Sequence, residues 1–496
     1  MKARAYLLGF GLAVLGLAGS SDVGRAQASP FVESGSWEAE LIERLRAAGA
    51  FRSLAAVSRP HAEAEVLDAL REVDTLRLSR VERVWYLELG RELWRRRRMP
   101  RRRPVAVTLR FEPGFRLGTA PTLDPFVIQR SGGVYPAASA AGAVEWGWVV
   151  AAFEGEWTRR EAGEAPVGDP GVLAFRAPVA YVRVARTWGD LVLGRVRWEL
   201  GAEAPESLLL GARPEPLPGL VWSVGSPRFR FRQVVSRLDR INEERRYLSV
   251  HRLEFRPVSG LDVGLTETVV WAGRGRGWEL GYLNPLVVYF SEQVNDATQP
   301  GNVKYGVDVA WRPHRRVELY GQVLIDDLTW EEGWPHRLGW LAGVRAGGVL
   351  PGLSFEAHGA KASALLYQSR RLGEAYVYQG QGIGANRTDY ERWTFVLHWD
   401  VLPWARFSPV YERLRQGPRN LWMVVPAGSP AQEPRGVGYV TDRIGFEGSG
   451  RLGSGLVTRF SVSYLKTDAP AEEWRWRAGE RLQGWIELQY RWGVAW

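Results

Sequence analysis

The stretch Trp393-Thr-Phe-Val-Leu-His-Trp-Asp-Val401 alternates two kinds of side chain. One phase holds Trp393, Phe395, Leu397, Trp399 and Val401, and the other holds Thr394, Val396, His398 and Asp400. Because successive side chains of a strand point to opposite faces, this pattern predicts a strand with one apolar and one mostly polar face. Such strands occur in soluble sandwiches and in membrane barrels.

The same period of two recurs along most of the chain. It is clear at residues 105–112, 317–326, 456–464 and 486–496, with Gly, Pro and Asp-rich turns between such stretches. We therefore place an antiparallel all-β domain at residues 104–496. At about 20–25 residues for each strand and its share of the loops, this length gives roughly 16–18 strands.

Three features favour a membrane barrel over a soluble β-sandwich or propeller. An export signal begins the chain, as described below. Tryptophans such as Trp311, Trp393 and Trp492 sit at strand ends on the apolar phase, which is typical of aromatic girdles. The last predicted strand is aromatic and ends at Trp496, although Glu487 departs from the apolar pattern of such C-terminal strands.

The N-terminus has the pattern of a secretory signal peptide. Lys2 and Arg4 precede an apolar run over residues 5–19, and a small-x-small site follows at Ala26-Gln-Ala28. We expect cleavage after Ala28, so residues 1–28 would be removed. The chain carries a net charge of +10 and contains no Cys, which excludes disulfides and thiol chemistry. An exported chain without Cys fits a Gram-negative envelope.

Residues 29–103 have helical periodicity instead. Apolar residues at helical spacing predict a first helix from Trp37 that ends at Gly49, and a second helix after Ser58-Arg59-Pro60. Ser79 and Glu82 form a capping box at the start of a third helix. We expect a separable, soluble helical bundle that is periplasmic or plug-like.

Motifs for catalysis or metal binding are absent from the sequence. The six His show no H-E-x-x-H spacing, and no G-x-S-x-G occurs. Asp326 and Asp327 are adjacent on a predicted strand, so their carboxylates point to opposite faces and cannot flank one bond. We expect no enzymatic activity, no metal and no cofactor.

The stretch Trp198-Glu-Leu-Gly-Ala-Glu-Ala-Pro-Glu-Ser-Leu-Leu-Leu-Gly211 and the motif Leu217-Pro-Gly-Leu220 resemble the Wzi family of capsule-assembly outer-membrane proteins. Residues 266–273, Tyr282-Leu-Asn-Pro285 and 320–327 extend this resemblance. The resemblance implies an 18-stranded barrel with a plug-like helical bundle on the periplasmic side. It also implies a lectin-like role that holds capsular or exopolysaccharide at the cell surface.

Polysaccharides are held by many weak contacts from carboxylates, amides and aromatic rings. The candidate contacts in the lumen phase are Asp308, Glu318, Tyr320, Gln322, Asp326 and Asp400, and those in loops or at the rim are Asn302 and Trp330. We expect Asp308 and Asp326 to touch water in the lumen. Each candidate could instead be an ordinary solvated residue. We expect polysaccharide and outer-membrane lipid as partners and no nucleic acid. The oligomeric state is open, and we favour a monomer. The rival functions are a passive porin for small solutes and an outer-membrane hydrolase.

A basic run separates the bundle from the first strand. It consists of Arg95, Arg96, Arg97, Arg98, Arg101, Arg102 and Arg103. The export signal argues against nucleic acid as its partner. Cations at a helix C-terminus beside a membrane rim are our preferred interpretation, and anionic lipid headgroups or an anionic polymer are the functional alternative.

Overall fold

The computed structural model describes most of the chain. The described residues are 28–97, 105–119, 133–159, 173–201, 207–211, 215–295, 301–327, 337–348, 350, 352–425, 437–453, 455–470 and 472–495. Residues 1–27, which hold nearly all of the predicted signal peptide, lie outside them. No helix among the described residues is both long enough and apolar enough to cross a membrane.

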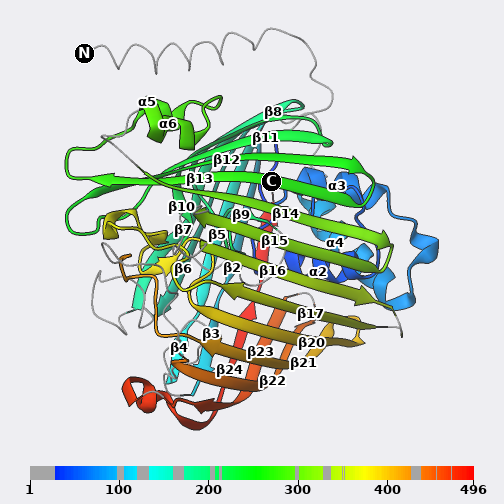
Figure 1. The fold of residues 1–496 in the computed structure, drawn as a ribbon. Coiled ribbons are helices and arrows are strands. Elements are labelled where there is room, and N and C mark those ends of the chain that lie inside the picture. Colours follow the sequence, from blue (N-terminus) through cyan, green and yellow to red (C-terminus); the bar gives the residue numbers. More distant parts are fainter. Residues whose placement is uncertain are drawn as a thin grey trace.

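One large antiparallel sheet closes on itself and forms a barrel (Figure 1). Its segments are β2 (Val105–Glu112), β3 (Gly114–Gly118), β4 (Gly133–Pro136), β5 (Ala138–Trp146), β6 (Val149–Arg159), β7 (Leu173–Arg186), β8 (Gly189–Val196), β10 (Leu217–Gly225), β11 (Phe229–Arg237), β12 (Arg245–Val258), β13 (Leu261–Gly273), β14 (Asn302–His314), β15 (Val317–Asp327), β16 (Arg337–Gly347), β17 (Leu353–Ala362), β20 (Tyr390–Leu402), β21 (Ala405–Gln416), β22 (Tyr439–Leu452), β23 (Leu456–Asp468), β24 (Gly479–Tyr490) and β25 (Trp492–Ala495). The last strand pairs with the first, because β24 pairs with β3 and β25 pairs with β2.

The barrel has 18 strands over the described residues. Its 21 hydrogen-bonded segments include three strands that are each interrupted by one residue: Pro113 between β2 and β3, Ala137 between β4 and β5, and Arg491 between β24 and β25. Each strand pairs antiparallel with its neighbours in the chain, so the prediction of an antiparallel barrel with 18 strands is confirmed.

The two phases of the strands separate as predicted. In β20, Trp393, Leu397 and Trp399 lie on the outside and are 40–54% exposed. In β15, Leu319 and Val323 face outward, whereas Tyr320 and Gln322 face the lumen and are buried. The outside of the barrel is therefore apolar, as a membrane-spanning wall requires.

The two ends of the barrel differ in their connections. At one end the strands are joined by short turns, such as 259–260 between β12 and β13 and 315–316 between β14 and β15. At the other end the connections are long, such as 274–301 between β13 and β14 and 363–389 between β17 and β20. The longer connections carry α5 (Leu280–Leu283), α6 (Tyr289–Asn295), η2 (Leu372–Glu374), η3 (Glu472–Arg477), β9 (Glu199–Leu200), β18 (Val377–Tyr378) and β19 (Gln381–Gly382).

A helical domain covers the end with the short turns (Figure 1). It consists of α2 (Trp37–Ala47), α3 (Glu63–Arg71), the short η1 (Thr75–Arg77) and α4 (Arg80–Arg97). Trp37, Leu67 and Leu89 are buried in its own hydrophobic core. The predicted capping box begins α4, because Ser79 N donates to Glu82 Oε2 at 2.7 Å and Glu82 N donates to Ser79 Oγ at 3.3 Å.

Polar contacts join this domain to the turns of the barrel. Trp85 Nε1 donates to the carbonyl oxygen of Pro403 at 2.7 Å. Arg451 of β22 donates to Glu88 at 3.1 Å and to Glu92 at 2.9 Å. The helices therefore have a core of their own and are also tied to the barrel mouth. Their independent folding as residues 29–103 stays a prediction.

Candidate functional site

Segments from both ends of the barrel enter the lumen and meet there. From the helical domain come residues 28–34 and 54–62, and from the end with long connections come residues 363–389 and the described residues of 197–211, which are 197–201 and 207–211. A segment from the helical domain and a segment from the long connections meet in a small sheet, in which β1 (Ser58–Arg59) pairs with β9. We call these four segments the plug. They share one hydrophobic core with the inner wall of the barrel.

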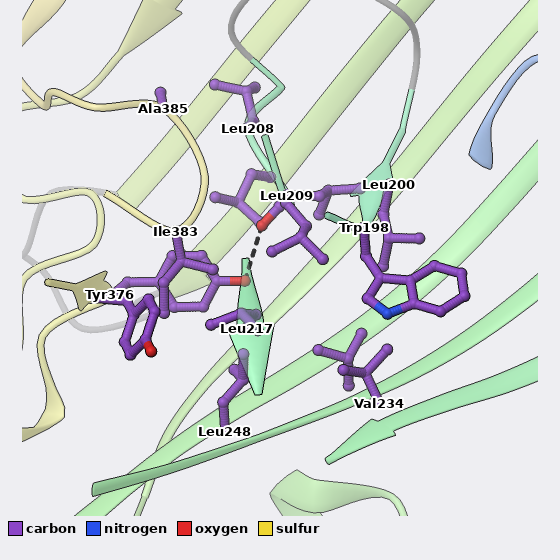
Figure 2. Close-up of a cluster of buried hydrophobic side chains, with 14 of the residues drawn as sticks. Trp198, Leu200, Leu208, Leu209, Leu217, Val234, Leu248, Tyr376, Ile383 and Ala385 are labelled. Carbon is purple, nitrogen blue, oxygen red and sulfur yellow. Dashed lines mark hydrogen bonds between the residues drawn. The ribbon is translucent and has the colours of Figure 1, made fainter. Parts of the chain in front are cut away.

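Figure 2 shows part of this core, where residues 208–210 and 363–389 pack against the wall. Tyr376 Oη donates to the carbonyl oxygen of Leu209 at 2.8 Å, and Tyr367 Oη donates to that of Leu208 at 2.7 Å. Leu217, Val234 and Leu248 contribute apolar side chains from the strands. The plug is thus held by apolar packing as well as by hydrogen bonds, unlike a solvated loop.

Asp308 is the first candidate contact, and it is buried with an arginine partner. Arg252 of β12 donates to its two carboxylate oxygens at 2.7 and 2.9 Å, and both side chains have zero exposure. The same guanidinium donates to the carbonyl oxygen of Val57 in the plug at 2.6 Å. The expectation that Asp308 touches water is wrong, because the plug fills the space in front of it.

Asp326 is buried in the same way. Its carboxylate lies 3.0 Å from Lys304 Nζ and accepts the backbone N–H of Tyr367 at 2.7 Å. Both charged side chains have zero exposure. The expectation of a water-facing Asp326 is therefore also wrong. The expectation fails because the segment 363–389 folds back into the lumen and covers the carboxylate of Asp326.

Glu318, Tyr320 and Gln322 follow one another on the lumen face of β15. Glu318 accepts from Arg46 of α2 at 3.0 and 3.1 Å, and Tyr320 Oη donates to Glu356 at 3.0 Å. Gln322 Oε1 accepts the backbone N–H of Leu208 at 2.8 Å. One strand face thus contacts the helical domain and the plug.

The remaining candidates are partly described. Asp400 accepts two hydrogen bonds from Arg406, at 2.9 and 2.7 Å, and lies 3.4 Å from Arg44 of α2. Asn302 Nδ2 donates to the carbonyl oxygen of Glu374 at 3.2 Å. Trp330 lies outside the described residues, as do Arg98, Arg101, Arg102 and Arg103. Arg95, Arg96 and Arg97 belong to the backbone of α4, but their side chains are not described.

The described candidates share a structural role that the sequence did not reveal. Most of them join the barrel wall to the plug or to α2 through ion pairs and hydrogen bonds. Their partners were missed, above all the lumen arginines of β12. Arg246 shows this best, because it donates to the carbonyl oxygens of Gly373, Ala375 and Val377 at 2.6–2.9 Å. The available signal was that Arg246 and Arg252 share the lumen phase of one strand.

A cavity of about 650 Å³ remains between the plug, α2 and the wall formed by β16, β17 and β20–β23. Its lining includes six arginines (Arg59, Arg345, Arg392, Arg406, Arg443, Arg459), six glutamates (Glu40, Glu43, Glu199, Glu356, Glu412, Glu447) and three histidines (His61, His358, His398). The size lies within the range of ligand pockets. Guanidinium and carboxylate groups in such numbers can donate to and accept from hydroxyl groups.

Charges at the cavity are largely compensated inside the protein. Glu412 accepts from Arg443 at 2.6 Å and also pairs with Arg392. Burial raises the pKa of Glu40, but Arg44 and Ser449 outweigh burial, so this pKa lies below the ordinary value. Burial, together with the nearby Arg59, lowers the pKa of His61 to about 3, so His61 is neutral at physiological pH. The cavity is thus a paired polar surface. No group of three or more side chains suited to a metal ion occurs in the described part of the chain.

Fold and lumen define a class: a large outer-membrane-type β-barrel whose interior is filled by its own chain and whose short-turn end carries a helical domain. Within that class, the family model described as "Capsule assembly protein Wzi" matches residues 180–426. The resemblance of this chain to the Wzi family is thereby confirmed.

One solved structure shares the fold, and others are more distantly similar. Wzi of Escherichia coli, described as an outer membrane protein involved in group 1 capsule assembly and as a carbohydrate binding beta-barrel, matches with a TM-score of 0.62 and 15% identity; the match covers 90% of this chain and 97% of that chain. OccAB1 of Acinetobacter baumannii has a TM-score of 0.47 and 9% identity, over 79% of this chain and 97% of that chain. OprD of Pseudomonas aeruginosa has a TM-score of 0.44 and 10% identity, over 79% and 95%. No curated protein sequence matches the chain.

Proposed function

We propose that this protein resides in the outer membrane of a Gram-negative envelope and holds capsular or exopolysaccharide at the cell surface without catalysing a reaction. One observation carries the proposal: residues 180–426, which match the Wzi family, include most of the plug and eleven of the 18 strands of the barrel wall. The solved E. coli relative is described as carbohydrate binding. In outer-membrane barrels the short turns face the periplasm, so the helical domain would be periplasmic and the long connections would face outward.

The filled lumen argues against the rival porin. Passive porins need a continuous aqueous channel, whereas this lumen holds four inserted segments with a shared apolar core. The described parts of the plug span the barrel from the helical domain to the long connections. The segments from the two ends meet where β1 pairs with β9. We therefore expect the closed protein to conduct small ions poorly.

The pairing of the cavity carboxylates argues against the rival hydrolase. Glycoside hydrolysis needs one carboxylic acid that can donate a proton and a second carboxylate at a fixed separation from it. Glu412 and Glu356 instead accept hydrogen bonds from arginines, which favour the ionised form of each group. Such carboxylates bind hydroxyl groups better than they donate protons.

Direct contact between polysaccharide and the eight candidate residues stays a prediction. Since Asp308, Gln322 and Asp326 contact protein groups in the structure, we propose that they support the binding of polysaccharide by holding the plug in place. The plug and the long connections would then present a fixed surface to the polysaccharide. A paired substitution of Lys304 and Asp326 distinguishes this indirect role from direct contact between the carboxylate and the sugar.

The test compares a deletion strain with strains that carry the wild-type or a variant gene. The measured quantity is the fraction of polysaccharide that stays with the cells after gentle washing. We expect the deletion to move polysaccharide into the medium and the wild-type gene to restore retention. Unchanged retention in the deletion strain would refute the proposal. Steady, large single-channel conductance of the purified protein in planar bilayers would favour the porin instead.

A further inference from the structure

The connection between β13 and β14 lies against the outer wall of the barrel. Leu265 of β13 pairs directly with Val307 of β14, and these outward side chains are 40% and 42% exposed. The pairing of the two strands has no register shift, so Trp271 lies on the same outward phase as Leu265. Trp271 is nevertheless fully buried, because Tyr282 of α5 packs on it with the ring centroids 5.0 Å apart. We call residues 277–295 the outer flap.

The outer flap covers polar side chains that the wall places on its outward phase. Tyr289 of α6 stacks on His251 with ring centroids 4.2 Å apart, and its hydroxyl lies 2.7 Å from Ser249 Oγ. Gln233 Nε2 donates to the carbonyl oxygen of Leu283 at 3.1 Å, and Glu267 accepts the backbone N–H of Phe290 at 3.3 Å. Without the flap, these polar groups of β11–β13 would face hydrocarbon, which is costly.

The height of this contact on the wall places it within the apolar band. Trp311, which is 47% exposed, marks the band near the short turns and pairs with Leu261. Glu267 lies six residues further along β13. At about 3.3 Å per residue and a tilt of about 40°, six residues climb roughly 15 Å, whereas the apolar band of such barrels is about 25 Å tall. The flap therefore meets the wall in the outer half of the membrane.

The exposed side chains of the flap are mostly apolar, although Asn284, Ser291 and Asn295 are exposed as well. Leu280 is 84% exposed, Leu286 91%, Val294 67% and Phe290 57%. These side chains continue the apolar surface formed by the outward residues of β13 and β14. In Figure 1, α5 and α6 lie on the side of the molecule away from the helical domain.

We propose that the outer flap is immersed in the outer leaflet and that its outer face contacts lipid acyl chains. It replaces a polar patch of the wall with an apolar one, so the membrane-facing surface stays continuous. The molecules that contact this face are lipids, because the exposed flap residues are continuous with the apolar band of the wall. This inference rests on the proposed membrane location.

The absence of Cys from the chain gives a clean background for the test. Leu286→Cys and Phe290→Cys are each labelled with an environment-sensitive fluorophore, and the full-length protein is reconstituted into vesicles of ordinary or acyl-chain-brominated phospholipid. Val307→Cys on the wall is the matched positive control, and Leu76→Cys of the helical domain, which is 88% exposed, is the negative control. We expect bromolipid to quench the two flap labels as strongly as the label at Val307 and to leave the label at Leu76 unchanged.

The controls separate this inference from the membrane location itself. Quenching at Val307 without quenching at Leu286 and Phe290 would refute the lipid contact while leaving the barrel in the membrane. No quenching at Val307 would instead contradict the proposed location. Flap labels that are shielded from water in native envelopes but are not quenched in bromolipid vesicles would assign the face to a protein partner and would also overturn the proposal.

Discussion

The carboxylate of Asp326 accepts the backbone N–H of Tyr367 at 2.7 Å, 41 positions further along the chain. This contact fixes the start of the segment 363–389 against the inner wall of β15. The same carboxylate pairs with Lys304, whose side chain has no exposed surface. This buried ion pair of the barrel wall therefore contacts the part of the plug that comes from the long connections.

Asp326→Asn should loosen this part of the plug while the barrel stays assembled. The change would leave the ammonium of Lys304 buried without an opposite charge, and breaking a buried pair in this way costs about 3–5 kcal/mol. We expect the segment 363–389 to become accessible to protease and the bilayer conductance to rise. Resistance to SDS without boiling should persist, because every strand is still paired.

The matched control for that prediction is Asp442→Asn. Asp442 lies 3.4 Å from Arg413, and both side chains are partly exposed. Such a pair contributes about 0–1 kcal/mol, so neither protease sensitivity nor conductance should change. Equal effects of the two substitutions would show that the buried pair has no special role in closing the lumen.

Asp308→Ala combined with Asp326→Ala should weaken the retention of polysaccharide. The loss should be partial if these carboxylates contact sugar, since a hydrogen bond to a charged group contributes about 1.5–3 kcal/mol among many contacts. Because both residues are buried, loss of retention can also follow from a displaced plug. The measurement is again cell-bound against released polysaccharide.

A paired substitution separates the two routes. Lys304→Met with Asp326→Asn removes both charges and keeps an amide oxygen that can accept the N–H of Tyr367, so stability should return close to that of the wild type. If Asp326 acts through the plug, retention recovers in this variant. If retention stays as low as with Asp326→Asn alone, the carboxylate itself is needed and direct contact is supported.

The alternation of side chains was enough to predict the barrel wall, because lipid on one side and polar groups on the other impose a period of two. The capping box of Ser79 and Glu82 was also predictable, because it too depends only on residues that are close in the sequence, here three positions apart. The burial of Asp308 was not readable. It depends on Arg252 and on Val57, which are far from it in sequence and meet it only when the plug enters the barrel.

The contacts of the outer flap with the barrel wall could not be predicted from the sequence either. On the sequence, His251 and Glu267 simply interrupt the apolar phase of two strands. In the structure, Tyr289 packs on His251 and the backbone of Phe290 bonds to Glu267. A polar residue on an outward phase can therefore indicate a covering segment, which becomes a usable signal once the strand register is known.

The isolated fragment of residues 29–103 should be helical in solution. Its core of Trp37, Leu67 and Leu89 is formed within the fragment. We expect a helical circular dichroism spectrum from the purified fragment and a cooperative thermal transition. A spectrum without helix, or insertion of the fragment into lipid vesicles, would show that the helices depend on the barrel.

The last prediction concerns the pH dependence of the N-terminal segment of the plug. Glu33 lies at a second cavity, of about 270 Å³, that is also lined by Glu154. Burial, and next the charge of Glu154, raise the pKa of Glu33 to about 8, although Arg110 and Arg197 act in the opposite direction. In the unfolded chain the same carboxyl ionises near its ordinary value of 4.5.

Between these two values the unfolded state binds fewer protons at Glu33 than the folded state, so the stability of this segment falls as the pH rises from about 4.5 to about 8. Glu33→Gln should remove the decline, because a neutral amide has no proton to lose. The measurement is the rate of proteolysis within residues 29–36, taken as the ratio of variant to wild type at pH 6 and at pH 9, which cancels the pH response of the protease. We expect the ratio to be below one at pH 6, where part of the decline has already occurred, and to fall much further at pH 9. Glu72→Gln, at an exposed position, is the matched control and should give a ratio near one at both pH values. A ratio for Glu33→Gln that does not change with pH would contradict the raised pKa.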